Sequence, residues 1–295
     1  MSIRKLSTVY SIVALLFVCG CGGAKEWSLE PIASVKGFKT PECAEVSPVD
    51  GTVYVSNLYA LSRTTVGALD SNGFISTLAP GGKLTQYESI KGTPDLPIHG
   101  ASGMCFFKGY LYFNDRNGPK RRKLDGSGPV EAVSVPGSKS FNDAGCDENY
   151  VYMTGNDEIY RVDAEGKSDK FLDLKGVNGI KSFKGKLFAV TTAKDKSDVY
   201  ELDPTGKEAP KPFGLAPKFA GIDGIVVLPD GTFIITDCHG HKVYSIGADR
   251  KTVKLLAEGL EYPADLDVDF ERRLVYVPQF FRGTVEVYRL KATDK

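Results

Sequence analysis

Side chains that carry oxygen recur at one equivalent position of a pattern that repeats along the chain. Each stands seven to nine residues before the turn that follows it, and the strongest candidates are Glu42, Asn142, Asn178 and Asp223. Two carboxylates and two amides are the hard oxygen ligands that calcium prefers, and the carboxylates would neutralise its charge. The pattern therefore predicts a site for a divalent cation, most simply Ca²⁺. The alternative is that these residues only form turns before strands.

A cation held in this way could support hydrolysis at a carbonyl group. It would polarise the carbonyl oxygen while a carboxylate or a histidine activates water. We predict that Asp223 is the base, with His99 and Asp143 as alternatives. His99 follows Pro97 closely and could equally be an ordinary surface-loop residue. The chain has no Gly-x-Ser-x-Gly motif, which argues against a covalent serine mechanism.

The repeating element is a turn followed by alternating aromatic and β-branched residues. Its copies begin at residues 51, 109, 149, 185, 231 and 273, in steps of 58, 40, 36, 46 and 42. A period near 40 residues is typical of one four-stranded propeller blade. We therefore predict an all-β chain, a six-bladed β-propeller with four-stranded blades, in which the candidate ligands surround the central channel. A large β-sandwich is the second choice, because it would not explain the period.

The two ends of the pattern predict how the ring closes. The last blade has only three strands of its own, and they end near Leu290. The stretch 27–33 has the pattern of the missing fourth strand, and adding it to the last blade would remove a free sheet edge. The long first step leaves extra chain at 58–66 and 85–97, which we expect to form a loop over one face.

The motifs around the candidate ligands resemble those of the senescence marker protein/gluconolactonase/luciferin-regenerating family, six-bladed propellers to which paraoxonases are related. The matching motifs are Pro-Glu at 41–42, Asn-Asp at 142–143, Asn-Gly at 178–179 and Asp-Gly at 223–224. The resemblance covers nearly the whole mature chain. It implies calcium bound by Glu42, Asn142, Asn178 and Asp223.

Two places depart from the gluconolactonase pattern. Cys43 and Ala44 follow Glu42, where gluconolactonases commonly have Gly-Pro, so the details of substrate binding need not carry over. The stretch His-Gly-Ala-Ser at 99–102 is more similar to paraoxonases, in which a histidine faces the active site. That similarity is what makes His99 a candidate base.

The N-terminus is typical of an export signal, with Arg4 and Lys5 before an apolar run at 12–18 that is too short to span a bilayer as a helix. The stretch 18–21 resembles a bacterial lipobox, which implies that Cys21 carries a lipid. We predict a lipoprotein signal peptide at 1–20, a lipidated tether at 21–25 and the propeller at 26–293. The protein would be anchored to a membrane of the bacterial cell envelope, facing the periplasm or exterior. A plain secretory signal is the alternative.

Composition excludes some partners and leaves the cysteines open. Lys and Arg together number 37, as do Asp and Glu, and this zero net charge argues against nucleic-acid binding. Cys43, Cys105, Cys146 and Cys238 could form disulfides in three pairings, or be small core residues. They are not spaced as Cys-x-x-Cys, and His numbers only three, so zinc is disfavoured.

Two classes of function fit these features. One, which the resemblance implies, is a calcium-dependent hydrolase of a lactone or related ester. The other is a non-catalytic surface propeller that binds a sugar, peptide or protein partner. Phe280 and Phe281 would suit a pocket wall or the core. We expect His239 and His241 to form a turn, and the protein to be a monomer.

Overall fold

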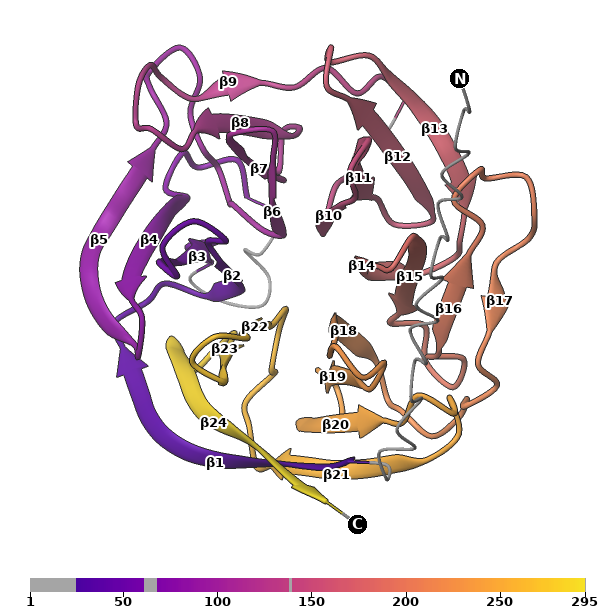
Figure 1. Ribbon diagram of the computed structural model, residues 1–295. Helices are drawn as coiled ribbons and strands as arrows, with labels where there is room; N and C mark the ends of the chain where they lie inside the picture. The colour runs from indigo at the N-terminus through magenta and orange to yellow at the C-terminus, as the bar shows by residue number, and fades with distance from the viewer. Residues whose placement is uncertain (1–24, 61–67, 138–139, 295) are drawn as a thin grey trace, which may run out of the picture.

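The computed structural model describes residues 25–60, 68–137 and 140–294. These residues form six four-stranded antiparallel sheets arranged around a central axis, and none of them is helical (Figure 1). Five of the sheets keep their strands in chain order, as expected when short turns connect antiparallel neighbours. The prediction of an all-β, six-bladed propeller is confirmed.

The first three blades follow one another around the ring, each with its first strand nearest the axis (Figure 1). Blade 1 consists of β2 (Pro41–Val46), β3 (Val53–Asn57), β4 (Phe74–Ala79) and β5 (Lys83–Lys91). Blade 2 consists of β6 (Met104–Phe107), β7 (Tyr110–Phe113), β8 (Lys120–Lys123) and β9 (Glu131–Ala132). Blade 3 consists of β10 (Ala144–Cys146), β11 (Tyr150–Thr154), β12 (Glu158–Asp163) and β13 (Ser168–Asp173).

The other three blades complete the ring. Blade 4 consists of β14 (Val177–Phe183), β15 (Lys186–Thr191), β16 (Val199–Leu202) and β17 (Lys211–Pro212). Blade 5 consists of β18 (Ile222–Val227), β19 (Phe233–Asp237), β20 (Lys242–Ile246) and β21 (Val253–Glu258). Blade 6 consists of β22 (Asp267–Asp269), β23 (Leu274–Gln279), β24 (Thr284–Asp294) and, as its outermost strand, β1 (Lys25–Lys36).

The ring closes through β1, as the sequence predicts. This strand pairs antiparallel with β24 from Lys25 opposite Asp294 to Lys36 opposite Thr284, with one irregularity between Pro31 and Ala33. The pairing is longer than the predicted 27–33 at both ends. Because β1 occupies the outer edge of blade 6, each blade of the ring has the same number of strands.

Apolar side chains fill the seams between the blades, in six separate clusters of buried residues. Between blades 4 and 5, for example, Phe188 and Phe233 meet edge to face with their ring centroids 5.0 Å apart. A propeller strand presents one face to each neighbouring blade, which explains why its apolar residues run almost continuously instead of alternating with polar ones. This packing holds the innermost strands in fixed positions around the axis.

The expectation for the extra chain of blade 1 is wrong in part. Most of 85–97 belongs to β5, which pairs with β4 through Phe74 opposite Lys91 and Ile75 opposite Ile90. This outer strand is largely exposed and polar, so its sequence resembles a loop. The other predicted insertion, 58–66, lies mostly outside the described residues.

The predicted signal peptide and Cys21 lie outside the described residues. Within the part of the chain that is described, no helix is long and apolar enough to cross a membrane. Cys43, Cys105, Cys146 and Cys238 are free thiols, the first two and the last buried and Cys146 half-buried. Their expected place in the core therefore holds for three of the four.

Candidate metal centre

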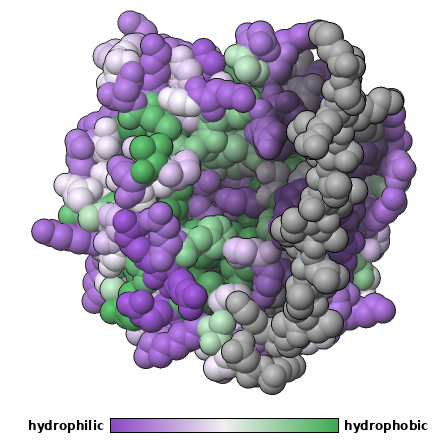
Figure 2. Space-filling model, in the orientation of Figure 1, coloured by the Kyte–Doolittle hydropathy of each residue, from purple (hydrophilic) through white to green (hydrophobic). Residues whose placement is uncertain are grey.

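The predicted ligands lie at one end of the innermost strands. Glu42, Asn178 and Asp223 are each the second residue of such a strand, and Asn142 stands just before β10. The innermost strands surround the axis, so these residues belong to one ring (Figure 1). Hydrophilic side chains occupy the middle of the molecule in the view along the axis, with hydrophobic ones around them (Figure 2).

An irregularity of strand pairing occurs at each predicted ligand. The register shifts between Pro41 and Ala44, between Val177 and Ile180, and between Ile222 and Ile225. In blade 3, Thr154 O accepts from Asn142 N at 2.8 Å while Thr154 N donates to Asp143 O at 2.9 Å, so two residues again face one. Such β-bulges redirect side chains and often lie next to active sites.

Several oxygens of this region are buried without a hydrogen-bond partner. They are Glu42 Oε2, Asn114 Oδ1, Asp143 Oδ1, Asn178 Oδ1 and Asp223 Oδ1. Buried polar atoms are nearly always paired in folded proteins, and a bound ion is one of the few explanations for a group of exceptions. Three of these oxygens belong to predicted ligands, so their chemistry fits a hard cation.

Amide oxygens are essential to this donor set. Within the described residues, no three side chains of His, Cys, Asp and Glu form a cluster that could hold a metal ion. A cation here would need Asn178 and Asn142 in addition to the carboxylates. Asn142 is half-buried, and its backbone oxygen already accepts from Gly103 N at 2.9 Å and Ser102 Oγ at 2.7 Å.

The carboxylates of the ring oppose one another electrostatically. Burial, followed by the negative charges of Asp223 and Asp143, raises the pKa of Glu42 well above its usual range, although Arg116 opposes the rise. Burial, with the charge of Asp143, raises the pKa of Asp223 to about 7. A divalent cation favours the ionised carboxylates and would reverse both effects. The ring is therefore suited to bind a cation in competition with protons.

Asp143, one of the alternative bases, is a fixed interior carboxyl. Its Oδ2 accepts from Ile180 N at 2.9 Å, and its backbone N donates to Thr154 Oγ1 at 2.9 Å. Burial raises its pKa to about 7. Gly103, just before the first strand of blade 2, makes room for the Asp143 carboxyl, since a Cβ on Gly103 would lie 2.0 Å from Asp143 Oδ1.

A polar side chain at the end of the second strand fixes the loop before the innermost strand in four blades. The contacts are Asn57 Oδ1 with Lys39 N at 2.8 Å, Asp115 Oδ1 with Gly100 N at 2.6 Å, Asp237 Oδ1 with Gly221 N at 2.9 Å and Gln279 Oε1 with Glu261 N at 2.6 Å. Asp237 thereby positions the segment that carries Asp223. Sequence reasoning missed this role, although Asn57, Asp115 and Asp237 all end copies of the repeat.

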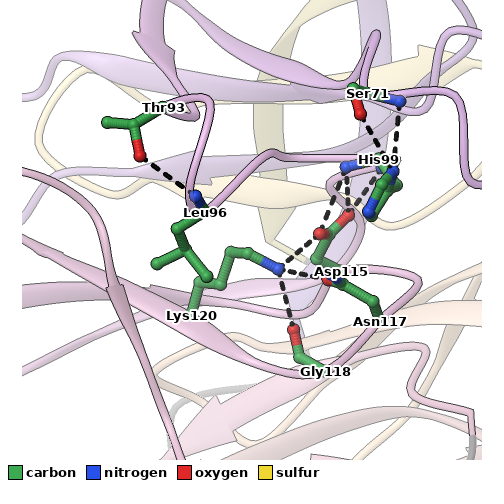
Figure 3. Close-up of polar contacts among 9 residues, drawn as sticks. Ser71, Thr93, Leu96, His99, Asp115, Asn117, Gly118 and Lys120 are labelled. Carbon is green, nitrogen blue, oxygen red and sulfur yellow. Dashed lines mark hydrogen bonds and ion pairs between the residues drawn. The ribbon is translucent and has the colours of Figure 1, made fainter.

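His99, the other alternative base, has one ring nitrogen engaged. Its Nδ1 accepts from Ser71 N at 3.1 Å, so the neutral ring carries its proton on Nε2 (Figure 3). The backbone N of His99 donates to Asp115, which also forms a buried ion pair of 2.6 Å with Lys120. This arrangement holds His99 in the loop before blade 2, and its role as a base stays a prediction.

Aromatic rings gather at the same end of the propeller as Asp223. Asp237, which pairs with Ile222, ends β19 at this end, and the turn that contains His241 follows it. The ring centroids of His241 and Tyr262 are 4.8 Å apart, those of Tyr262 and Phe281 5.3 Å, and those of Phe280 and Phe281 4.8 Å. The turn predicted at His239 and His241 is confirmed. We call His241, Tyr262, Phe280 and Phe281 the aromatic rim; all four are half-buried.

Arg116 and Asp265 are further charged residues of the channel that sequence reasoning did not identify. Arg116 follows β7, and its Nε is buried without a partner. Asp265 follows Ala264, which occupies in blade 6 the position that the predicted ligands occupy in their blades, and it accepts a hydrogen bond from the Cys43 thiol at 3.1 Å. Asp143 and Asp265 both stand one residue after a ring position, and this regularity could have identified Asp265.

Solved structures with the same fold include enzymes and a calcium-binding protein, whereas no protein-family model and no curated protein matches the chain. Regucalcin from Agrobacterium tumefaciens, described as a calcium-binding protein, has a TM-score of 0.68 at 14% identity, covering 91% of this chain and 97% of its own. A luciferin-regenerating enzyme has a TM-score of 0.65 at 14% identity, covering 90% and 95%. Virginiamycin B lyase from Staphylococcus aureus has a TM-score of 0.62 at 14% identity, covering 90% and 99%. The predicted resemblance is thus confirmed at the level of the fold.

Proposed function

We propose that this propeller is a calcium-dependent hydrolase of a lactone or related ester. The observation that carries the proposal is the group of unpartnered, buried oxygens on Glu42, Asn178 and Asp223 at one end of the channel. The fold it shares with regucalcin and with a luciferin-regenerating enzyme agrees with this reading. When bound, calcium would polarise the carbonyl group and stabilise the charge that develops on its oxygen.

The chain's own residues would supply orientation and proton transfer. Asp223 is our choice of base, because a bound cation would keep its carboxyl ionised and so able to accept a proton beside the substrate. Asp143 and His99 remain the alternatives. Asp143 is more firmly held by Ile180 N, which suits a positioning carboxyl, and His99 can offer only one free nitrogen.

Calorimetric titration of the purified protein with calcium tests the proposal. We expect calcium to bind at neutral pH. The variants Asn178→Ala and Asp223→Asn should each bind calcium about 10-fold to 100-fold more weakly. Asn149→Ala, which alters an exposed turn residue of the same type, is the matched control and should bind normally. Hydrolysis of a panel of lactones and esters should then disappear with a chelator and return with calcium.

The titration also has a clear negative result. A folded protein that takes up no heat at millimolar calcium would rule out the metal-dependent hydrolase. Calcium binding with no turnover of any lactone or ester would instead retain the metal site and reject the enzyme.

We also propose that the protein is a lipoprotein of the bacterial cell envelope, attached through Cys21. The support is the lipobox-like stretch at 18–21 behind a short apolar run. Cell fractionation should place the unaltered protein with the membranes. The variant Cys21→Ser should be absent from the membrane fraction. Recovery of both forms in the soluble fraction would contradict the anchor.

A non-catalytic binding propeller is the second candidate, and the aromatic rim favours it. Rings that pack edge to face, such as Tyr262 and Phe281, provide apolar area with little loss of side-chain freedom, as binding surfaces require. In addition, a cavity of about 410 Å³ is lined by Val46, Asp267, Phe270 and their neighbours and by none of the predicted ligands. Binding of a sugar or peptide that is insensitive to a chelator would support this alternative.

A further inference from the structure

Two of the four described thiols lie together at the end of the channel away from the predicted ligands. Cys105 is in β6, three residues beyond Ser102, and Cys146 ends β10, four residues beyond Asn142. These strands are the innermost strands of adjacent blades, joined by the hydrogen bond from Gly103 N to Asn142 O. The two thiols are close enough for each to shift the pKa of the other, and the thiol of Cys146 donates to Phe106 O at 3.1 Å.

A cavity gives solvent access to this pair. A cavity of about 160 Å³ is lined by both cysteines together with Glu45, Phe106, Lys181 and Ser182. Cys146 is half-buried, whereas Cys105 is 3% exposed. A small reagent entering the cavity therefore meets Cys146 first, with Cys105 behind it.

The other two cysteines are committed elsewhere. Cys43 is fully buried and donates to Asp265 Oδ2 at 3.1 Å. Cys238 lies in the turn at the opposite end of the propeller, where it contacts the carboxyl of Asp223. The geometry thus favours none of the three complete pairings of four cysteines. It favours a single disulfide between Cys105 and Cys146.

We propose that Cys105 and Cys146 form a thiol–disulfide site, which a small disulfide oxidises to a cross-link between blades 2 and 3. The thiolate of Cys146 attacks the reagent, forms a mixed disulfide and releases one half as a thiolate. Cys105 then loses its proton and attacks the Cys146 sulfur, which releases the second half. Two electrons pass to the reagent, one disulfide forms, and one is broken.

The environment assigns different roles to the two thiols. The neighbouring Cys105 thiol, aided by the charge of Lys181, lowers the pKa of Cys146, whereas burial raises the pKa of Cys105 well above its usual range. Attack needs a thiolate, so Cys146 is the first to react and Cys105 resolves the mixed disulfide. The site is independent of the proposed hydrolase activity.

Oxidation of the full-length protein with hydroxyethyl disulfide tests the site. After alkylation of the remaining thiols and proteolysis, mass spectrometry should find the peptides of Cys105 and Cys146 joined, and a reductant should separate them. Cys105→Ala should accumulate the mixed disulfide on Cys146. In Cys146→Ala, Cys105 should stay unmodified over the same time. Cys238→Ala is the matched control and should form the cross-link as the unaltered chain does.

The unaltered chain alone can overturn the proposal, so a variant that fails to fold does not weaken the test. A cross-link from either residue to another cysteine would contradict it. So would two free thiols after a reference thiol in solution has reacted completely. Equal reactivity of Cys105 in folded Cys146→Ala would contradict the assigned order of attack.

Discussion

Raising the pH from about 4 to about 7 is expected to lower the free energy of unfolding of the calcium-free protein. Burial raises the pKa of Asp143 and of Asp223 to about 7, whereas both carboxyls would titrate near 3.8 in the unfolded chain. Between these values the native state binds more protons than the unfolded state, so its stability falls as the pH rises. For Asp143 alone, the rise from 3.8 to about 7 corresponds to about 4 kcal/mol, as an upper limit.

Urea unfolding in the presence of a chelator, at several pH values across this window, measures the effect. Asp143→Asn is the matched variant, because it keeps the shape and the acceptor for Ile180 N but cannot titrate, and its pH dependence should be weaker. Saturating calcium should stabilise the protein more at pH 7 than at low pH, since the cation competes with protons. A chelated protein whose stability rises with pH across the window would refute the assignment.

Lys120→Met is expected to destabilise the protein by about 3–5 kcal/mol. The ammonium of Lys120 lies 2.6 Å from Asp115 Oδ2, and the two side chains are 2% and 0% exposed. Removing the cation leaves the Asp115 carboxylate buried without its counter-charge, although it still accepts from the backbone of His99 (Figure 3) and from that of Gly100. Chemical unfolding measures this loss.

The surface offers a matched control for that substitution. Lys186 pairs with Glu201 at 3.2 Å, but its side chain is 53% exposed, so Lys186→Met should cost less than about 1 kcal/mol. The double variant Asp115→Asn with Lys120→Met should recover part of the loss, because it leaves no buried charge. Equal effects of the two single lysine variants would show that burial does not decide the strength of the Asp115–Lys120 pair.

The inner strands could be predicted from the sequence, and the outer ones only in part. Strands such as β11 and β19 are flanked by other blades on both faces, and their aromatic and β-branched residues repeat with the period of the ring. Outer strands make fewer contacts: β9 and β17 have two residues each, and β5 is polar and exposed. No hydrophobic pattern marks them, because little of their surface is buried.

The candidate site divides in a similar way. Glu42, Asn142, Asn178 and Asp223 could be aligned because the repeat fixes their distance from the following turn. The bulges that redirect their side chains, and the room that Gly103 leaves for Asp143, depend on contacts between blades. Such contacts leave no spacing pattern within one blade, so they could be found only from the structure.

The pairing of β1 with β24 has a consequence for how the molecule is made. Among the described residues β1 pairs only with β24. Five blades and most of the sixth lie between these two strands in the chain, so β1 stays unpaired until β24 has been synthesised. Contacts of such long sequence separation form slowly, because the chain entropy of bringing distant segments together opposes them. Until β24 is available, β1 is an open edge with which any other strand can pair, including that of a second nascent chain.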